Sequence, residues 1–146
     1  MQTTAAPPRE IHLPDFNFAG LSVDDLIDVL NFVKPLTDQF DTALPSFGRP
    51  FTAKSISYPG CIEDTQIGEV VSSIQAWAVR QERRIIERLT VVSTADQTAD
   101  EHDYRAATLM ADVLRGGDWS QAKTLFERLA IEAATIQVGG ARGSAH

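Results

Sequence analysis

Apolar side chains recur every three to four residues over most of the chain, and this spacing constrains the fold more than any other feature. Four such stripes are present, and they begin near Ser22, Asp64, Thr98 and Asp118. Residues three and four apart lie on one face of an α-helix, so each stripe predicts an amphipathic helix with one buried side. Helices of this kind bury their stripes by packing against one another. We therefore expect an all-α fold, a helical bundle of about four helices.

The expected helices carry local start and stop signals. Ser22 and the acidic residues after it are typical of a helix N-terminus. Pro35 lies inside the first stripe and predicts a kink or a break near residues 31–34, because proline has no amide hydrogen. The second and longest helix is expected over about 64–92. Gly116-Gly117 is typical of a helix end, here that of the third helix.

The remaining segments are irregular. Residues 1–20 contain three prolines and alternating apolar residues, which predicts an extended N-terminal arm that packs on its own domain or binds a partner. Prolines and glycines across 45–63 predict an irregular loop, with a short strand or extended run within 51–58. Residues 139–146 predict a flexible C-terminal tail, which leaves 21–138 as the bundle domain.

Composition and charge narrow the function classes. The formal net charge of −7 disfavours binding to phosphate backbones and to anionic lipid, so we expect neither a nucleic-acid nor a membrane partner. No stretch approaches the roughly 18 apolar residues of a membrane span, and the N-terminus does not resemble a secretory signal. Cys61 is the only cysteine and cannot form an intramolecular disulfide. A cytoplasmic location is the resulting expectation.

One segment of the last two helices resembles a known repeat. The run Gly117-Asp118-Trp119-Ser120-Gln121-Ala122, followed by Leu125-Phe126-Glu127-Arg128-Leu129-Ala130, is similar to the second half of a tetratricopeptide repeat. The resemblance implies that Ala122 lets two helices approach closely and that Trp119 and Phe126 fill the groove between them. It covers about a quarter of the chain and has no second copy, whereas a solenoid needs about three repeats. An ordinary antiparallel helical hairpin is the alternative.

Two sets of polar residues are candidate binding groups. One is the arginine cluster of the long helix, which predicts contact with an anion or an acidic partner, or else a solvated face: Arg80, Arg83, Arg84 and Arg88. The other contains polar residues near predicted apolar faces, which would line a pocket between helices or lie at the edge of the core: Gln81, Glu82, His102 and Tyr104.

The chain lacks the residue patterns of common catalytic and metal sites. Its three histidines are scattered, and neither a His-x-x-x-His nor a Cys-x-x-Cys spacing is present. There is also no Gly-x-Ser-x-Gly segment and no glycine-rich phosphate loop. We therefore expect no metal and no cofactor, and we favour a protein that is not an enzyme.

The resulting functional hypothesis is a non-catalytic interaction or regulatory module that self-associates, with a two-fold dimer as the simplest form. Its interface would use apolar residues outside or at the edges of the stripes: Ile27, Phe32, Trp77, Ile86 and Trp119. The first alternative is a small-ligand-binding protein or enzyme with a pocket between helices. The second is a nucleic-acid-associated regulator that uses the face of Arg80 and Arg84.

Overall fold

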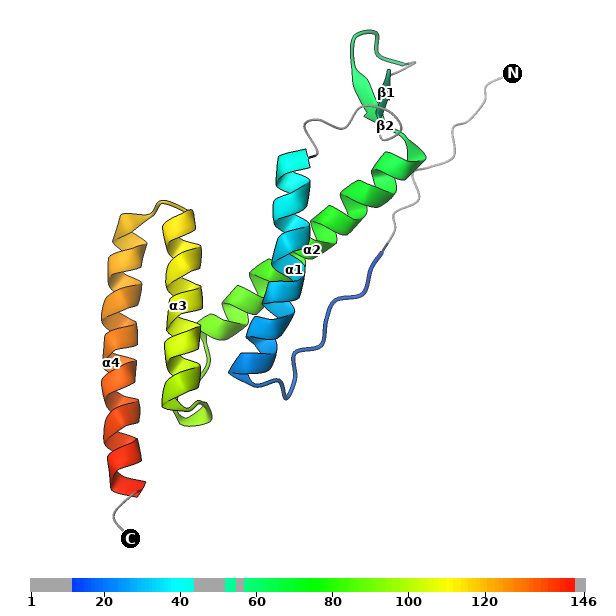
Figure 1. Ribbon diagram of the computed structural model, residues 1–146. Helices are drawn as coiled ribbons and strands as arrows, with labels where there is room; N and C mark the ends of the chain where they lie inside the picture. The colour runs from blue at the N-terminus through cyan, green and yellow to red at the C-terminus, as the bar shows by residue number, and fades with distance from the viewer. Residues whose placement is uncertain (1–11, 44–51, 55–56, 144–146) are drawn as a thin grey trace. The chain divides into compact units, whose positions relative to one another are not determined.

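The computed structural model describes residues 12–43, 52–54 and 57–143, most of which are α-helical (Figure 1). The elements in chain order are α1 (Val23–Ala43), β1 (Thr52–Lys54), β2 (Ile62–Asp64), α2 (Gln66–Thr90), the short 3-10 helix η2 (Thr94–Asp96), α3 (Ala99–Arg115) and α4 (Trp119–Gly143). The predicted all-α class with four helices is confirmed.

Capping boxes fix the starts of α1 and α3 at the predicted residues. The Asp25 amide donates to the Ser22 hydroxyl at 3.1 Å, and the Ser22 amide donates to the Asp25 carboxylate at 2.9 Å. Thr98 and Glu101 make the equivalent pair at the start of α3, at 3.2 and 2.7 Å. Each box satisfies two backbone amides that have no partner within the helix.

Two helix boundaries differ from the expectation. α1 continues through Pro35 without the break that was one of the two expected effects of this proline, because the loss of one amide donor is tolerated within an otherwise continuous helix. α2 begins at Gln66 rather than near residue 64, because Ile62–Asp64 form β2. Thr65 caps α2 by accepting a hydrogen bond from the Gly68 amide at 3.2 Å.

The predicted irregular loop contains a small antiparallel hairpin. β1 pairs with β2 in the register Thr52 to Asp64, Ala53 to Glu63 and Lys54 to Ile62. Gly60 takes a positive φ of 88° in the turn, a conformation that favours glycine. All of β2 is exposed. Residues 44–51 and 55–56 of this segment lie outside the described residues.

The chain divides into two compact units, and each is described by itself. Unit 1 comprises Met1–Phe16 and Val33–Gln81, and unit 2 comprises Asn17–Phe32 and Glu82–His146. Unit 1 therefore contains the second part of α1, the hairpin and the first part of α2. Unit 2 contains the start of α1, the end of α2 and the whole of α3 and α4.

Unit 2 holds most of the buried apolar side chains. Within it, α3 and α4 pack as an antiparallel hairpin (Figure 1), and Gly117 makes the turn between them with a φ of 72°. The buried apolar residues of unit 2 are Phe18, Val23, Leu26, Ile27, Leu30, Ile85, Leu89, Leu109, Ala122 and Leu129. Burial of a leucine or isoleucine side chain stabilises the fold by about 2 kcal/mol, so this cluster is the main core.

Among the residues that the structure describes, unit 1 buries fewer apolar side chains. Val33 and Ala78 are fully buried, as is the polar Gln81, and Thr37 is 7% exposed. Ile67 and Val70, which belong to the predicted stripe of α2, are exposed.

The two ends of the chain are described only in part. Residues 12–18 have no regular secondary structure, as expected for the N-terminal arm, and 1–11 lie outside the described residues. At the other end, α4 continues to Gly143, five residues beyond the expected helix end at 138. Residues 139–143 of the predicted tail are therefore helical.

Candidate functional site

The N-terminal arm is bound within unit 1 by three of the predicted candidate residues, Trp77, Arg80 and Gln81. The Asp15 carboxylate accepts from Arg80 Nε at 2.8 Å and from Gln81 Nε2 at 2.7 Å. Trp77 Nε1 donates to the Pro14 carbonyl at 2.9 Å, and its ring meets the Phe16 ring edge-on at 5.1 Å. Their side chains thus have partners within the chain.

Gln81 has no exposed surface, and both ends of its amide bind the arm. Nε2 donates to Asp15, while Oε1 accepts from the Phe16 amide at 3.0 Å. A buried amide that satisfies donor and acceptor in this way fixes the path of the chain that it binds. Gln81 therefore acts as a clamp for the arm rather than as a free pocket group.

The four arginines of α2 do not act as one basic site. Arg80 pairs with Asp15 in unit 1, whereas Arg84 belongs to unit 2 and lies over the Phe18 ring at 5.0 Å. Arg83 and Arg88 are exposed. Because two of the four guanidinium groups already have carboxylate or aromatic partners, the cluster offers fewer binding groups to an anion than the sequence suggests.

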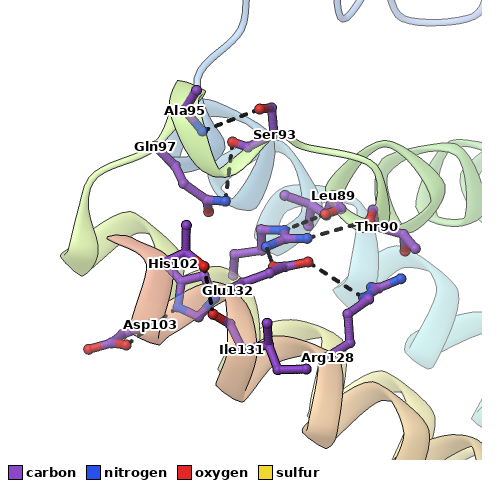
Figure 2. Close-up of polar contacts among 12 residues, drawn as sticks. Leu89, Thr90, Ser93, Ala95, Gln97, His102, Asp103, Arg128, Ile131 and Glu132 are labelled. Carbon is purple, nitrogen blue, oxygen red and sulfur yellow. Dashed lines mark hydrogen bonds and ion pairs between the residues drawn. The ribbon is translucent and has the colours of Figure 1, made fainter. Parts of the chain in front are cut away.

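Unit 2 contains a buried ionic cluster that joins the end of α2 to α3 and α4 (Figure 2). Arg105 is fully buried and donates to the Leu89 carbonyl at 2.5 Å and to the Thr90 carbonyl at 3.4 Å. These carbonyls belong to the last residues of α2, which have no amide partner within the helix. Arg105 thus caps the C-terminus of α2.

Glu132 on α4 neutralises this buried arginine. Its carboxylate lies 2.7 Å from Arg105 Nη1 and 3.6 Å from Arg128 Nε. His102, which is buried, places Nε2 at 3.6 Å from the same carboxylate, too far for a hydrogen bond. The cluster is closed to solvent at Arg105 and His102 and ties the end of α2 to α3 and α4.

Arg105 and Glu132 were not among the predicted site residues, although the sequence of α3 contains a signal for Arg105. His102, Arg105 and Leu109 are spaced by three and four and form the buried line of α3. An arginine in line with a core leucine was therefore the available sign of a buried ion pair.

The other candidate polar residues, Glu82, His102 and Tyr104, differ in burial and in partners. Glu82 is buried and accepts from Arg115 Nη2 at 2.6 Å. This hydrogen bond raises the pKa of Arg115 above its ordinary value. Tyr104 is 58% exposed. Glu82, His102 and Tyr104 thus each have a different environment within unit 2.

Unit 2 also carries a groove of about 450 Å³ between the end of α2, α3 and α4. Its apolar lining includes Ile86, Val113 and Leu125, while Asp112 and Arg128 provide charges. This volume lies within the range of pockets that bind small molecules. Ile86, a predicted interface residue, therefore lies in a concave surface.

Exposed apolar side chains gather on α4. Trp119, Phe126, Ile131 and Val138 are 75%, 63%, 69% and 57% exposed. The expectation that Trp119 and Phe126 fill the groove between two helices is therefore wrong, because most of each side chain is exposed. Ala122, by contrast, is buried as the repeat resemblance implies.

Two further candidate interface residues differ from each other. Phe32 is 67% exposed and available for contact, whereas Ile27 is buried in the core of unit 2. The sequence placed both off the main stripe of α1, but α1 buries more than one side at its N-terminal end. Ile27 is therefore removed from the set of interface residues.

Searches for similar proteins and for metal or membrane features give no match. No family model, curated protein or solved structure matches this chain. Within the described residues, no group of three or more His, Cys, Asp or Glu side chains could hold a metal ion. None of the helices described here combines the length and the apolar character needed to span a bilayer.

Proposed function

We propose that this protein is a non-catalytic helical interaction module that self-associates. The observation that carries the proposal is the set of large apolar side chains exposed on α4, from Trp119 to Val138. Scattered exposed apolar residues are ordinary, but several on one helix are typical of a surface that another protein covers. Tryptophan is also the residue type most often responsible for binding energy at interfaces.

The polar residues support a non-catalytic role. Arg80 and Gln81 hold the arm, Glu82 pairs with Arg115, and the buried Arg105 caps α2. Each is engaged in holding the chain together.

The test is the mass of the full chain in solution, measured by light scattering after size exclusion over a wide range of concentrations. We expect a dimer that dissociates on dilution, and a Trp119→Ser/Phe126→Ser variant that is monomeric throughout. Val91→Ser is the matched control, because Val91 is 69% exposed and lies outside α4. A wild-type chain that remains monomeric up to its solubility limit would overturn the proposal.

A second candidate function is binding of a small amphipathic molecule in the groove of unit 2. Ile86, Val113 and Leu125 offer an apolar lining and Arg128 offers a cation, which together suit an apolar chain that ends in a carboxylate. Octanoate is a suitable probe. We expect it to raise the melting temperature of the wild type and not that of Leu125→Trp, which fills the groove. Equal melting temperatures with and without octanoate contradict this candidate.

A further inference from the structure

One surface of α4 combines exposed apolar groups with a balanced pair of charges. We define the α4 outer face as the exposed residues Trp119, Lys123, Phe126, Glu127, Ile131 and Val138. Its two ionic side chains are Lys123 and Glu127, which are 80% and 63% exposed and lie 4.0 Å apart. Ala122 and Leu129, which are buried, pack on the core of unit 2 next to this face.

The charge of this face differs from that of the whole chain. The chain carries a formal net charge of −7, whereas the α4 outer face carries one positive and one negative group. Two copies that approach through an acidic surface, such as the exposed Asp24 and Asp25 of α1, repel each other. The α4 outer face lets two copies meet without that repulsion, which favours a second copy as its occupant.

We infer that two copies of the chain pair along α4 in antiparallel orientation, with Lys123 of each copy opposite Glu127 of the other. This inference rests on the proposed self-association and specifies its geometry. In a parallel two-fold pair, each residue faces its own copy, so Lys123 would meet lysine and Glu127 would meet glutamate. In an antiparallel pair, the same two residues make two ion pairs of opposite sign.

The register that pairs Lys123 with Glu127 also brings apolar residues of the two copies together. Lys123 and Glu127 lie two residues on either side of position 125, and Trp119 and Ile131 lie six residues on either side of it. A two-fold axis at position 125 therefore brings Trp119 of one copy to the level of Ala130 and Ile131 of the other. A tryptophan ring beside a small alanine and a branched isoleucine is a compact apolar contact.

The extent of the overlap predicts the strength of the dimer. Residues 119–131 of an α-helix span about 18 Å. A contact of this length is at the small end of specific interfaces, so we expect a dimer with a dissociation constant in roughly the micromolar range. Val138 lies beyond this overlap and is not needed for it.

Charge-reversal variants, studied alone and mixed, distinguish an ion pair between Lys123 and Glu127 of two copies from one within a single helix. Lys123→Glu and Glu127→Lys each place like charges opposite each other in the homodimer. We expect each to raise the dissociation constant about tenfold in sedimentation equilibrium, because two attractive pairs become repulsive. An equimolar mixture of the two variants should regain wild-type affinity as a heterodimer, since every pair between its chains is then of opposite sign. The variant Lys123→Glu/Glu127→Lys should also dimerise as the wild type does.

Matched controls change the net charge at exposed positions outside α4. Lys54→Glu and Glu87→Lys alter the charge by the same amounts and should leave the dissociation constant within about twofold of the wild type. If the wild type dimerises but the mixture stays as weak as its components, the antiparallel register is wrong while self-association stands. If the wild type is monomeric, both the register and the proposed function fail.

Discussion

The two parts of α2 present the same sequence pattern and have different environments. In its second part, Ile85 and Leu89 are fully buried in unit 2. In its first part, Ile67 and Val70 continue the same stripe but are 53% and 36% exposed in unit 1. Helical spacing therefore identifies which side of a helix is apolar, but it does not say how much of that side finds a partner within the chain.

Polar contacts also differ between the two parts. The first part binds the N-terminal arm through the buried amide of Gln81 and through a partly exposed ion pair, that of Arg80 and Asp15, which are 43% and 45% exposed. The second part ends at a fully buried arginine that caps its last carbonyls. The ion pair in unit 1 is thus open to water, whereas Arg105 of the ion pair in unit 2 is not.

The largest expected effect concerns the buried cap of α2. Replacement of Arg105 with Met leaves the carbonyls of Leu89 and Thr90 without their partner and removes the nearest cation from Glu132, so we expect a loss of about 3–5 kcal/mol in the free energy of unfolding. Urea denaturation followed by circular dichroism measures it. Arg105→Met/Glu132→Leu removes both charges and should recover part of the loss. A loss below about 1 kcal/mol in the single variant would show that the pair is not desolvated.

The next effect compares the two parts of α2 directly. Leu89→Ala removes a fully buried side chain and should cost about 3 kcal/mol in the free energy of unfolding. Val70→Ala changes a half-exposed position of the same stripe and should cost about 0.5 kcal/mol. Both values come from urea denaturation of the full chain. Equal losses in the free energy of unfolding at the two positions contradict the difference in burial. If self-association covers Val70, the loss for Val70→Ala falls when the protein is diluted.

A smaller effect is expected at the arm. Trp77→Phe keeps an aromatic ring beside Phe16 but removes the hydrogen bond to the Pro14 carbonyl, at a cost of about 1 kcal/mol. The arm should then be cut faster by a protease under native conditions. Val79→Ala, at a 45% exposed position on the same helix, is the control and should leave the cleavage rate unchanged. Identical rates in both variants mean that the indole hydrogen bond does not hold the arm.

The smallest effect concerns the exposed capping box of α1 and its pH dependence. Hydrogen bonds from the backbone amide and then the hydroxyl of Ser22 lower the pKa of Asp25. Since this pKa is lower in the folded state, the stabilisation is present above the ordinary carboxylate pKa and is lost as the pH falls through the lowered value. Asp25→Asn should be slightly less stable than the wild type at neutral pH and equal to it in acid. A constant difference across this pH range would contradict the assignment.

Several features could be read from particular residues of the sequence. Ser22 and Thr98 have side chains that compete for the first amides of a helix, so α1 and α3 start where these residues predict. Gly117 was recognisable as a helix end because glycine readily takes a positive φ. These are local effects, in which the residues that interact are neighbours in the chain.

The candidate sites depended on distant residues and were predicted less well. Gln81 was correctly selected as a polar group on an apolar face, but its partners Asp15 and Phe16 lie more than 60 residues away along the chain. Trp119 and Phe126 were expected to fill a groove because the aromatic residues of the tetratricopeptide repeat, which this segment resembles, pack between two helices. Their exposure depends on how far α4 is rotated against α3, which local spacing does not specify.

The sequence by itself determined the helical class, the caps and the positions of the four apolar stripes, because each follows from contacts within a few residues. Only the tertiary structure decided which stripes are covered, that Arg105 binds the end of α2, and that the α4 outer face is exposed. These depend on which distant surfaces meet, and the free energy of an apolar or ionic group is set by the partner and the water around it rather than by its place in the chain.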